Sequence, residues 1–132
     1  MKIFDSSKDE EIWWGKVNFV DENDVYVGYD TDQECCEDVG YFIAEKITPY
    51  SYGLNPEKTN KPDIDGYVFD KAFFEYVASN DRMLDAGGMV AFKMTCDGKP
   101  DLFLHLYNAH NGYYGHGFEV KHSGEIVISD YL

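Results

Sequence analysis

Alternating and continuous apolar runs along the chain predict a protein made mainly of β-strands. Residues 16–20 and 25–30 carry β-branched and aromatic side chains, and the polar residues 21–24 between them are typical of a turn, so these segments predict a first hairpin. Residues 39–43 predict a third strand. Further strands are expected over residues 89–95, 101–108, 115–122 and 125–129.

Dipeptides suited to positive φ separate these last four strands and predict two-residue hairpin turns. They are Asp97-Gly98, Asn111-Gly112 and Ser123-Gly124. A turn at Asn111-Gly112 places Tyr107 opposite His116, His105 opposite Phe118 and Phe103 opposite Val120. Cross-strand partners share a face. The expected core face then carries Val90, Phe92, Met94, Phe103, His105, Tyr107, His116, Phe118, Val120 and Val127.

Residues 70–78 predict the one helix. Asp70 is a suitable N-cap, and Phe69 with Phe74 fits a hydrophobic staple. Phe73, Phe74 and Val77 fall on one side at helical spacing, which is typical of a helix that covers a sheet. The expected fold is therefore α+β and mostly β: a twisted antiparallel sheet of about six or seven strands built from consecutive hairpins, with one short helix on one face.

At 132 residues the chain is expected to form a single domain over residues 1–132, with eleven Tyr and nine Phe as core material. A long irregular connection at about residues 48–66 contains three of the four prolines. The N-terminal segment lacks the features of a signal peptide, and three cysteines in such a chain indicate reduced thiols. These features predict a cytoplasmic protein, and no apolar run is long enough to predict a membrane span.

The net charge of −14 is concentrated near the N-terminus. Residues 1–45 hold thirteen acidic residues against three lysines, a net charge of −10, and residues 46–132 hold twelve against eight basic residues, a net charge of −4. Such a surface repels nucleic acid and anionic membranes and favours a basic partner or a cation, although charge that serves only solubility explains the same composition.

Two histidines are candidates for chemistry. On the expected sheet His105 and His116 lie one pairing step apart with Tyr107 between them, which would suit metal binding or proton transfer. No sequence pattern supplies the third ligand of a catalytic zinc site, and histidines satisfied by hydrogen bonds in an aromatic core explain the same residues. No cofactor-binding fingerprint is present, so no cofactor is expected.

The cysteines and the acidic residues around them give weaker signals. Adjacent residues on a strand point to opposite sides, so Cys35 and Cys36 are poorly placed to share a metal, and a structural role is favoured over a zinc or redox site. Asp30, Asp32 and Glu34 resemble the start of a calcium loop, but Cys35 stands where that loop needs glycine.

Three short motifs carry a resemblance to a known family: Glu34-Cys-Cys-Glu37, Gly-Tyr-Val-Phe-Asp at residues 66–70 and Asn-Gly-Tyr-Tyr-Gly at residues 111–115. Together they resemble a family of small uncharacterised bacterial and phage proteins, a domain of unknown function with a Cys-Cys pair and a terminal NGYYG. The resemblance implies a compact α+β or mostly-β fold and supplies no activity or catalytic residues.

The leading functional hypothesis is a non-enzymatic acidic binding protein, an immunity or antitoxin-like inhibitor of a basic partner. The expected contact residues are five carboxylates and two aromatic anchors: Asp30, Asp32, Glu34, Glu37, Asp38, Trp13 and Trp14. Two alternatives stay open: a small metal-dependent or acid/base enzyme that uses His105, His116 and Tyr107, with His110 nearby, and a phage-associated DNA mimic or structural protein. The oligomeric state is left undetermined.

Overall fold

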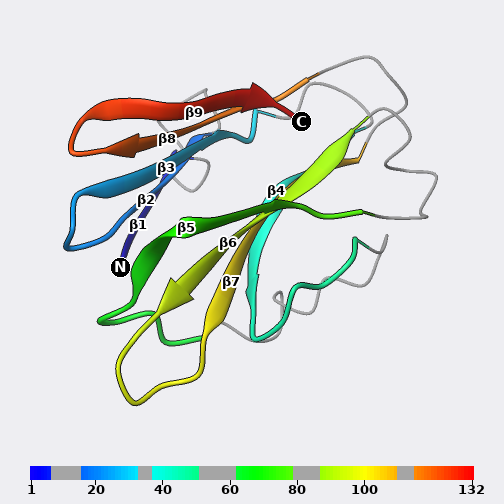
Figure 1. Ribbon diagram of the computed structural model, residues 1–132. Helices are drawn as coiled ribbons and strands as arrows, with labels where there is room; N and C mark the ends of the chain where they lie inside the picture. The colour runs from blue at the N-terminus through cyan, green and yellow to red at the C-terminus, as the bar shows by residue number, and fades with distance from the viewer. Residues whose placement is uncertain (7–15, 33–36, 51–61, 79–86, 110–114) are drawn as a thin grey trace.

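The computed structural model describes residues 1–6, 16–32, 37–50, 62–78, 87–109 and 115–132, which form two antiparallel sheets (Figure 1). Sheet A has the strand order β1-β2-β3-β8-β9, and sheet B has the order β4-β7-β6-β5. The strands of sheet A are β1 (Lys2–Asp5), β2 (Lys16–Val20), β3 (Val25–Asp30), β8 (Gly117–His122) and β9 (Glu125–Tyr131). Those of sheet B are β4 (Asp38–Ala44), β5 (Val68–Tyr76), β6 (Gly88–Thr95) and β7 (Leu102–Ala109).

Apolar side chains from both sheets meet in one core, so the sheets pack face to face. Side chains alternate along each strand of sheet A: Val17 and Phe19 of β2 are fully buried, whereas Asn18 between them lies on the opposite side. Leu104 and Leu106 of β7 bring the apolar side of sheet B to the same core. We call the side of sheet A that faces away from this core its outer face.

Sheet B is covered on its second side as well. Phe42, Met89 and Tyr107 form a second apolar cluster with Tyr50, which follows β4 in the chain. A strand that is buried on both faces needs apolar residues at consecutive positions and not only at alternate ones. This explains why β7 is buried along nearly its whole length.

The seven strands predicted from the sequence are confirmed, with bounds that differ by one or two residues at most. The β2–β3, β6–β7 and β8–β9 hairpins are confirmed too. Ser123 and Gly124 have φ values of 50° and 82°, as the predicted two-residue turn requires. Strand β1 was not predicted.

The helix predicted over residues 70–78 is wrong, because residues 70–76 belong to strand β5. Phe69 and Phe74 pair with β6, and the residues between them form a bulge. Asp70 accepts a hydrogen bond from the amide of Ala72 at 3.0 Å, so it closes a local turn in the bulge and does not cap a helix. Among the described residues, no helix is long and apolar enough to cross a membrane.

The predicted hairpin between residues 101–108 and 115–122 is also wrong. Strand β7 pairs with β4 and β6 in sheet B, whereas β8 pairs with β3 and β9 in sheet A. The mostly-β class is confirmed, but two sheets replace the single sheet of six or seven strands. Both sides of β7 are occupied by other strands, so β8 has no edge of β7 on which to pair.

The expected composition of the core face changes with this topology. Phe92 pairs with Leu104, and Val90 pairs with Leu106, so the leucines of β7 face the main core. His105 and Tyr107 consequently lie on the other side of sheet B. The cause is the β6–β7 turn, where the amide of Lys99 donates to the Cys96 carbonyl oxygen at 3.1 Å and sets a register one residue away from the expected one.

Candidate functional site

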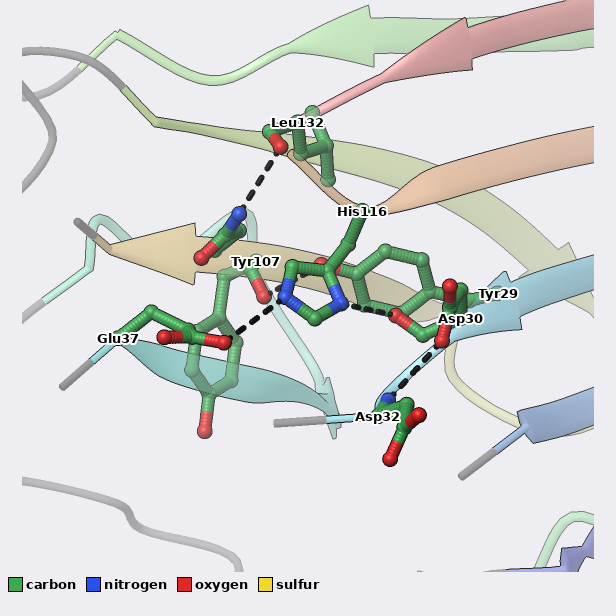
Figure 2. Close-up of polar contacts among 8 residues, drawn as sticks. Tyr29, Asp30, Asp32, Glu37, Tyr107, His116 and Leu132 are labelled. Carbon is green, nitrogen blue, oxygen red and sulfur yellow. Dashed lines mark hydrogen bonds and ion pairs between the residues drawn. The ribbon is translucent and has the colours of Figure 1, made fainter. Parts of the chain in front are cut away.

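A buried hydrogen-bonded pair, His116 and Glu37, joins the two sheets (Figure 2). His116 directly precedes β8 and is 2% exposed, and Glu37 directly precedes β4 and is 3% exposed. The His116 Nε2 and Glu37 Oε1 atoms are 3.2 Å apart. Nδ1 of His116 lies 2.9 Å from the carbonyl oxygen of Asp30, the last residue of β3. One imidazole therefore holds the ends of three chain segments.

The hydrogen bonds of His116 define the position of one of its protons. A backbone carbonyl only accepts, so Nδ1 carries a proton that it donates to Asp30. The contact between Nε2 and the Glu37 carboxylate needs a further proton, either on the imidazole or on the carboxyl group. The pair therefore holds one shared proton in a place that is closed to solvent, and we interpret it as a bond between the sheets.

Further polar contacts surround this pair. The Tyr29 ring lies edge-on to His116 with centroids 6.5 Å apart, and its hydroxyl donates to the Tyr107 carbonyl oxygen at 2.7 Å (Figure 2). The side-chain amide of Asn108 donates to the carbonyl oxygen of Leu132 at 2.9 Å. Leu132 also exchanges two backbone hydrogen bonds with His116, both at 2.9 Å. These contacts fix Leu132 against both sheets.

His105 lies elsewhere, on the second side of sheet B, and is fully buried. Its Nδ1–H donates to the Phe103 carbonyl oxygen at 3.0 Å, and its Nε2 accepts from the Thr48 amide at 2.9 Å. The ring stacks on Phe42 with a centroid distance of 4.1 Å. Burial lowers the pKa of His105 from 6.5 to about 4, so its imidazole is neutral at physiological pH.

The arrangement expected for catalysis or metal binding is not formed. His105 and His116 belong to different sheets, and each imidazole uses both ring nitrogens in hydrogen bonds. Tyr107 is buried and packs against Tyr50 with ring centroids 5.4 Å apart. Within the described segments, no group of three or more His, Cys, Asp or Glu side chains could hold a metal ion.

Four of the predicted contact residues can be placed. Asp30, Asp32 and Asp38 are partly exposed, and we call these three residues the acidic edge. Glu37, in contrast, is turned inward to His116 and does not present its carboxylate at the surface. Trp13, Trp14, Glu34, Cys35, Cys36 and His110 lie outside the described residues. Cys96 carries a free thiol.

A groove of about 290 Å³ on the outer face of sheet A lies next to the acidic edge. Asp30 belongs to both. We call this hollow the tyrosine groove; its main lining residues are Lys16, Asn18, Tyr26, Gly28, Asp30, Glu119 and Tyr131. The sequence reasoning missed it, although a glycine in the middle of the alternating strand 25–30 is the kind of signal that marks a hollow or a close approach.

A smaller hollow of about 190 Å³ lies at the β5 bulge. Its walls are mostly apolar and include Phe69, Phe73, Phe74 and Val127. Asp70, Lys71 and His122 also line it, but apolar side chains predominate, so we interpret it as a gap in the packing beside the bulge.

Comparisons with protein families, with curated proteins and with solved structures found no match. The resemblance to a family of small bacterial and phage proteins therefore stays a prediction.

Proposed function

We propose that this protein is a non-enzymatic binding protein that recognises a basic partner protein, in the manner of an immunity or antitoxin-like inhibitor. The acidic edge is the observation that supports this proposal. Its carboxylates lie where the chain leaves sheet A after β3 and enters sheet B at β4. Within the described residues, Asp30, Asp32 and Asp38 form no ion pair with a lysine or arginine.

Two of these three side chains are held in place by hydrogen bonds. Oδ1 of Asp30 accepts from the amide of Asp32 at 3.0 Å, and Oδ2 of Asp38 accepts from the Tyr50 hydroxyl at 2.6 Å. Side chains that are already ordered lose less conformational entropy when a partner binds. A carboxylate that is not already in an ion pair also stays available to a lysine or arginine of the partner.

The whole molecule supports the same partner chemistry. A net charge of −14 on 132 residues repels acidic surfaces and accelerates the encounter with basic ones. This long-range attraction depends on total charge, whereas a specific interface depends on where the carboxylates are. The experiment must separate these two contributions.

The test is capture of partners from a lysate of the source cells with the immobilised full-length chain and with two charge-matched variants. The acidic-edge variant combines Asp30→Asn, Asp32→Asn and Asp38→Asn. The control variant neutralises three exposed carboxylates away from this edge: Asp63→Asn, Asp65→Asn and Asp97→Asn. Each variant removes three negative charges from −14 and so carries −11. Oδ1 of Asp63 also accepts from the amide of Asp65 at 3.0 Å, so the control changes a matching local hydrogen bond.

We expect the wild-type chain and the control variant to retain one basic protein at low salt and to release it at high salt. The acidic-edge variant is expected to lose it. Equal capture by the two variants, or capture of no basic protein by the wild-type chain, would overturn the proposal. Thermal unfolding of all three proteins shows whether a loss of binding is a loss of fold.

The identity of the captured protein also decides between an inhibitor and a DNA mimic. A partner that duplex DNA displaces from the acidic edge would favour a mimic of the DNA backbone. A basic enzyme whose activity the chain suppresses without competition from DNA would favour an inhibitor.

A further inference from the structure

The tyrosine groove exists because glycines stand where neighbouring strands bring side chains together. A β-carbon at Gly28 would lie 2.6 Å from the hydroxyl oxygen of Tyr26, so only glycine lets this tyrosine lie along its own strand. The Tyr26 hydroxyl then donates to Oδ1 of Asn18 at 2.6 Å. On the other side, the Tyr131 ring lies over Gly117, where an added β-carbon would be 3.3 Å from a ring carbon.

The two tyrosines differ in their freedom. Tyr26 is fixed by its hydrogen bond and is only partly exposed, whereas Tyr131 is 74% exposed. A large aromatic side chain that is this exposed beside a polar hollow is a typical contact residue in protein interfaces. Tyr26 therefore forms a rigid aromatic wall of the groove, and Tyr131 forms a second aromatic wall that a ligand can contact from solvent.

The charges that line the groove are mainly negative. Its lining residues include the carboxylates of Asp30, Glu119 and Asp130, against the single cation Lys16. Asp130 is already bound to the Tyr76 hydroxyl and to the amide of Tyr131. The carboxylate of Asp30 forms no ion pair with a lysine or arginine among the described residues. Asp30 lines the groove and is also one of the three residues of the acidic edge.

One side chain of the protein already shows how this surface holds a cation. Nζ of Lys121 lies 3.2 Å from Oε1 of Glu119 and 5.1 Å from the centroid of the Tyr26 ring. An ammonium group is therefore bound between a carboxylate and a tyrosine face at the border of the groove. Asp30 and Tyr131 offer the same pair of chemical groups, and Lys16, which stands opposite Asp30 on β2, forms no ion pair with it.

We propose that the tyrosine groove binds the guanidinium group of an arginine presented by the basic partner, with Asp30 as the acceptor and the Tyr131 ring as the stacking face. The partner itself rests on the function proposed above. A planar guanidinium suits this place better than an ammonium, because it stacks on an aromatic ring while its N–H groups donate to a carboxylate in the plane.

The experiment is an NMR titration of the ¹⁵N-labelled full-length chain with the blocked tripeptide N-acetyl-Gly-Arg-Gly-amide. The control peptide carries citrulline, the neutral isostere of arginine, at the central position. We expect the arginine peptide to shift the amide signals of Gly28, Asp30 and Glu119, and the citrulline peptide to leave them in place. Equal shifts with both peptides, or shifts confined to other parts of the molecule, would overturn the inference.

Substitutions with opposite expected effects strengthen the test. Asp30→Asn is expected to weaken binding of the arginine peptide about fivefold, and Tyr131→Ala by about the same factor. Lys16→Gln is expected to tighten it about threefold, because it removes the repelling cation. Asp63→Asn, an exposed change of equal charge outside the groove, should have no effect. If Asp30→Asn and Lys16→Gln change the affinity in the same direction, the groove does not recognise charge as proposed.

Failure of this inference and failure of the proposed function give different results. If the peptide does not shift the groove but the acidic-edge variant still loses a basic partner, the partner is bound without an arginine in the groove. If the peptide binds in the groove but no basic protein is captured, the groove is a cation site and the proposed function is wrong.

Discussion

At the scale of single residues, the two histidines that the sequence marks as candidates for chemistry serve packing and hydrogen bonding. His105 stacks on Phe42 and bonds through both ring nitrogens, and His116 bonds to Glu37 and to the backbone of Asp30. The alternative that both are structural was visible in the sequence. Their partners were not, because a contact such as His116 to Glu37 joins residues far apart in the chain.

His105 gives a prediction about pH. Its pKa is about 4 in the folded protein against 6.5 for the unperturbed group, so below pH 6.5 the unfolded chain takes up a proton that the folded chain does not. This histidine alone should lower the free energy of unfolding by about 2 kcal/mol between pH 7.5 and pH 5. Urea unfolding at the two pH values measures the change.

The variant His105→Asn separates this contribution from that of the carboxylates. It should be less stable than the wild type at pH 7.5, because the Thr48 and Phe103 bonds are disturbed, but its stability should depend less on pH. An NMR titration of the His105 imidazole with a midpoint near 6.5 would contradict the account.

At the scale of elements, local sequence patterns predicted the positions of most strands correctly, but they predicted less well which strands pair with each other. The alternation of apolar and polar residues predicted β2 and β3 correctly, because each strand has one face in the core and one outside it. The same pattern did not predict β5, because the bulge between Phe69 and Phe74 interrupts the alternation of apolar and polar residues. Phe73, Phe74 and Val77 also fit helical spacing, which led to the wrong prediction of a helix. A turn signal such as Asn111-Gly112 does not say whether the chain returns to the same sheet, so β7 and β8 were paired wrongly.

The turn that begins after β2 contains a link between the sheets that the sequence did not reveal. Asp21 is 7% exposed, and its Oδ1 accepts from the amides of Asn23 and Val25 at 2.9 and 3.0 Å. Its Oδ2 accepts from the amide of Phe69 in β5 at 2.8 Å. Asp21→Asn replaces one acceptor by a donor and should lower the free energy of unfolding by about 2 kcal/mol, measured by urea unfolding.

The matched control is Asp24→Asn, the same chemical change on an exposed side chain of the same turn. Its φ of 59° is one that asparagine tolerates well, so its effect should stay within about 0.5 kcal/mol. Equal losses for the two variants would show that Asp21 does not connect the sheets as described.

The β8–β9 turn provides a stabilising change. Ser123 has a φ of 50°, which asparagine adopts more readily than serine, and Gly124 follows with a φ of 82°. Ser123→Asn should raise the free energy of unfolding by about 0.5 kcal/mol, whereas Gly124→Ala should lower it by about 1 kcal/mol or more. Thermal unfolding of the two variants checks the signs, and a loss of stability in Ser123→Asn would contradict the turn geometry.

At the scale of the whole molecule, the sequence itself contains the concentration of acidic residues in the first third of the chain. It also singled out Asp30, Asp32 and Asp38, which the structure describes as partly exposed. It did not predict the tyrosine groove, because that surface forms only when β8 and β9 join β2 and β3 in one sheet. Segments from opposite ends of the chain build it, and no local pattern contains that pairing.

The decisive measurement is the affinity for the captured basic partner at fixed salt, compared between the wild-type chain and the two charge-matched variants. We expect the acidic-edge variant to bind about tenfold more weakly or worse, since it removes several charge contacts, and the control variant to stay within about twofold of the wild type. If both variants lose the same affinity, total charge and not the acidic edge governs binding, and the account is wrong.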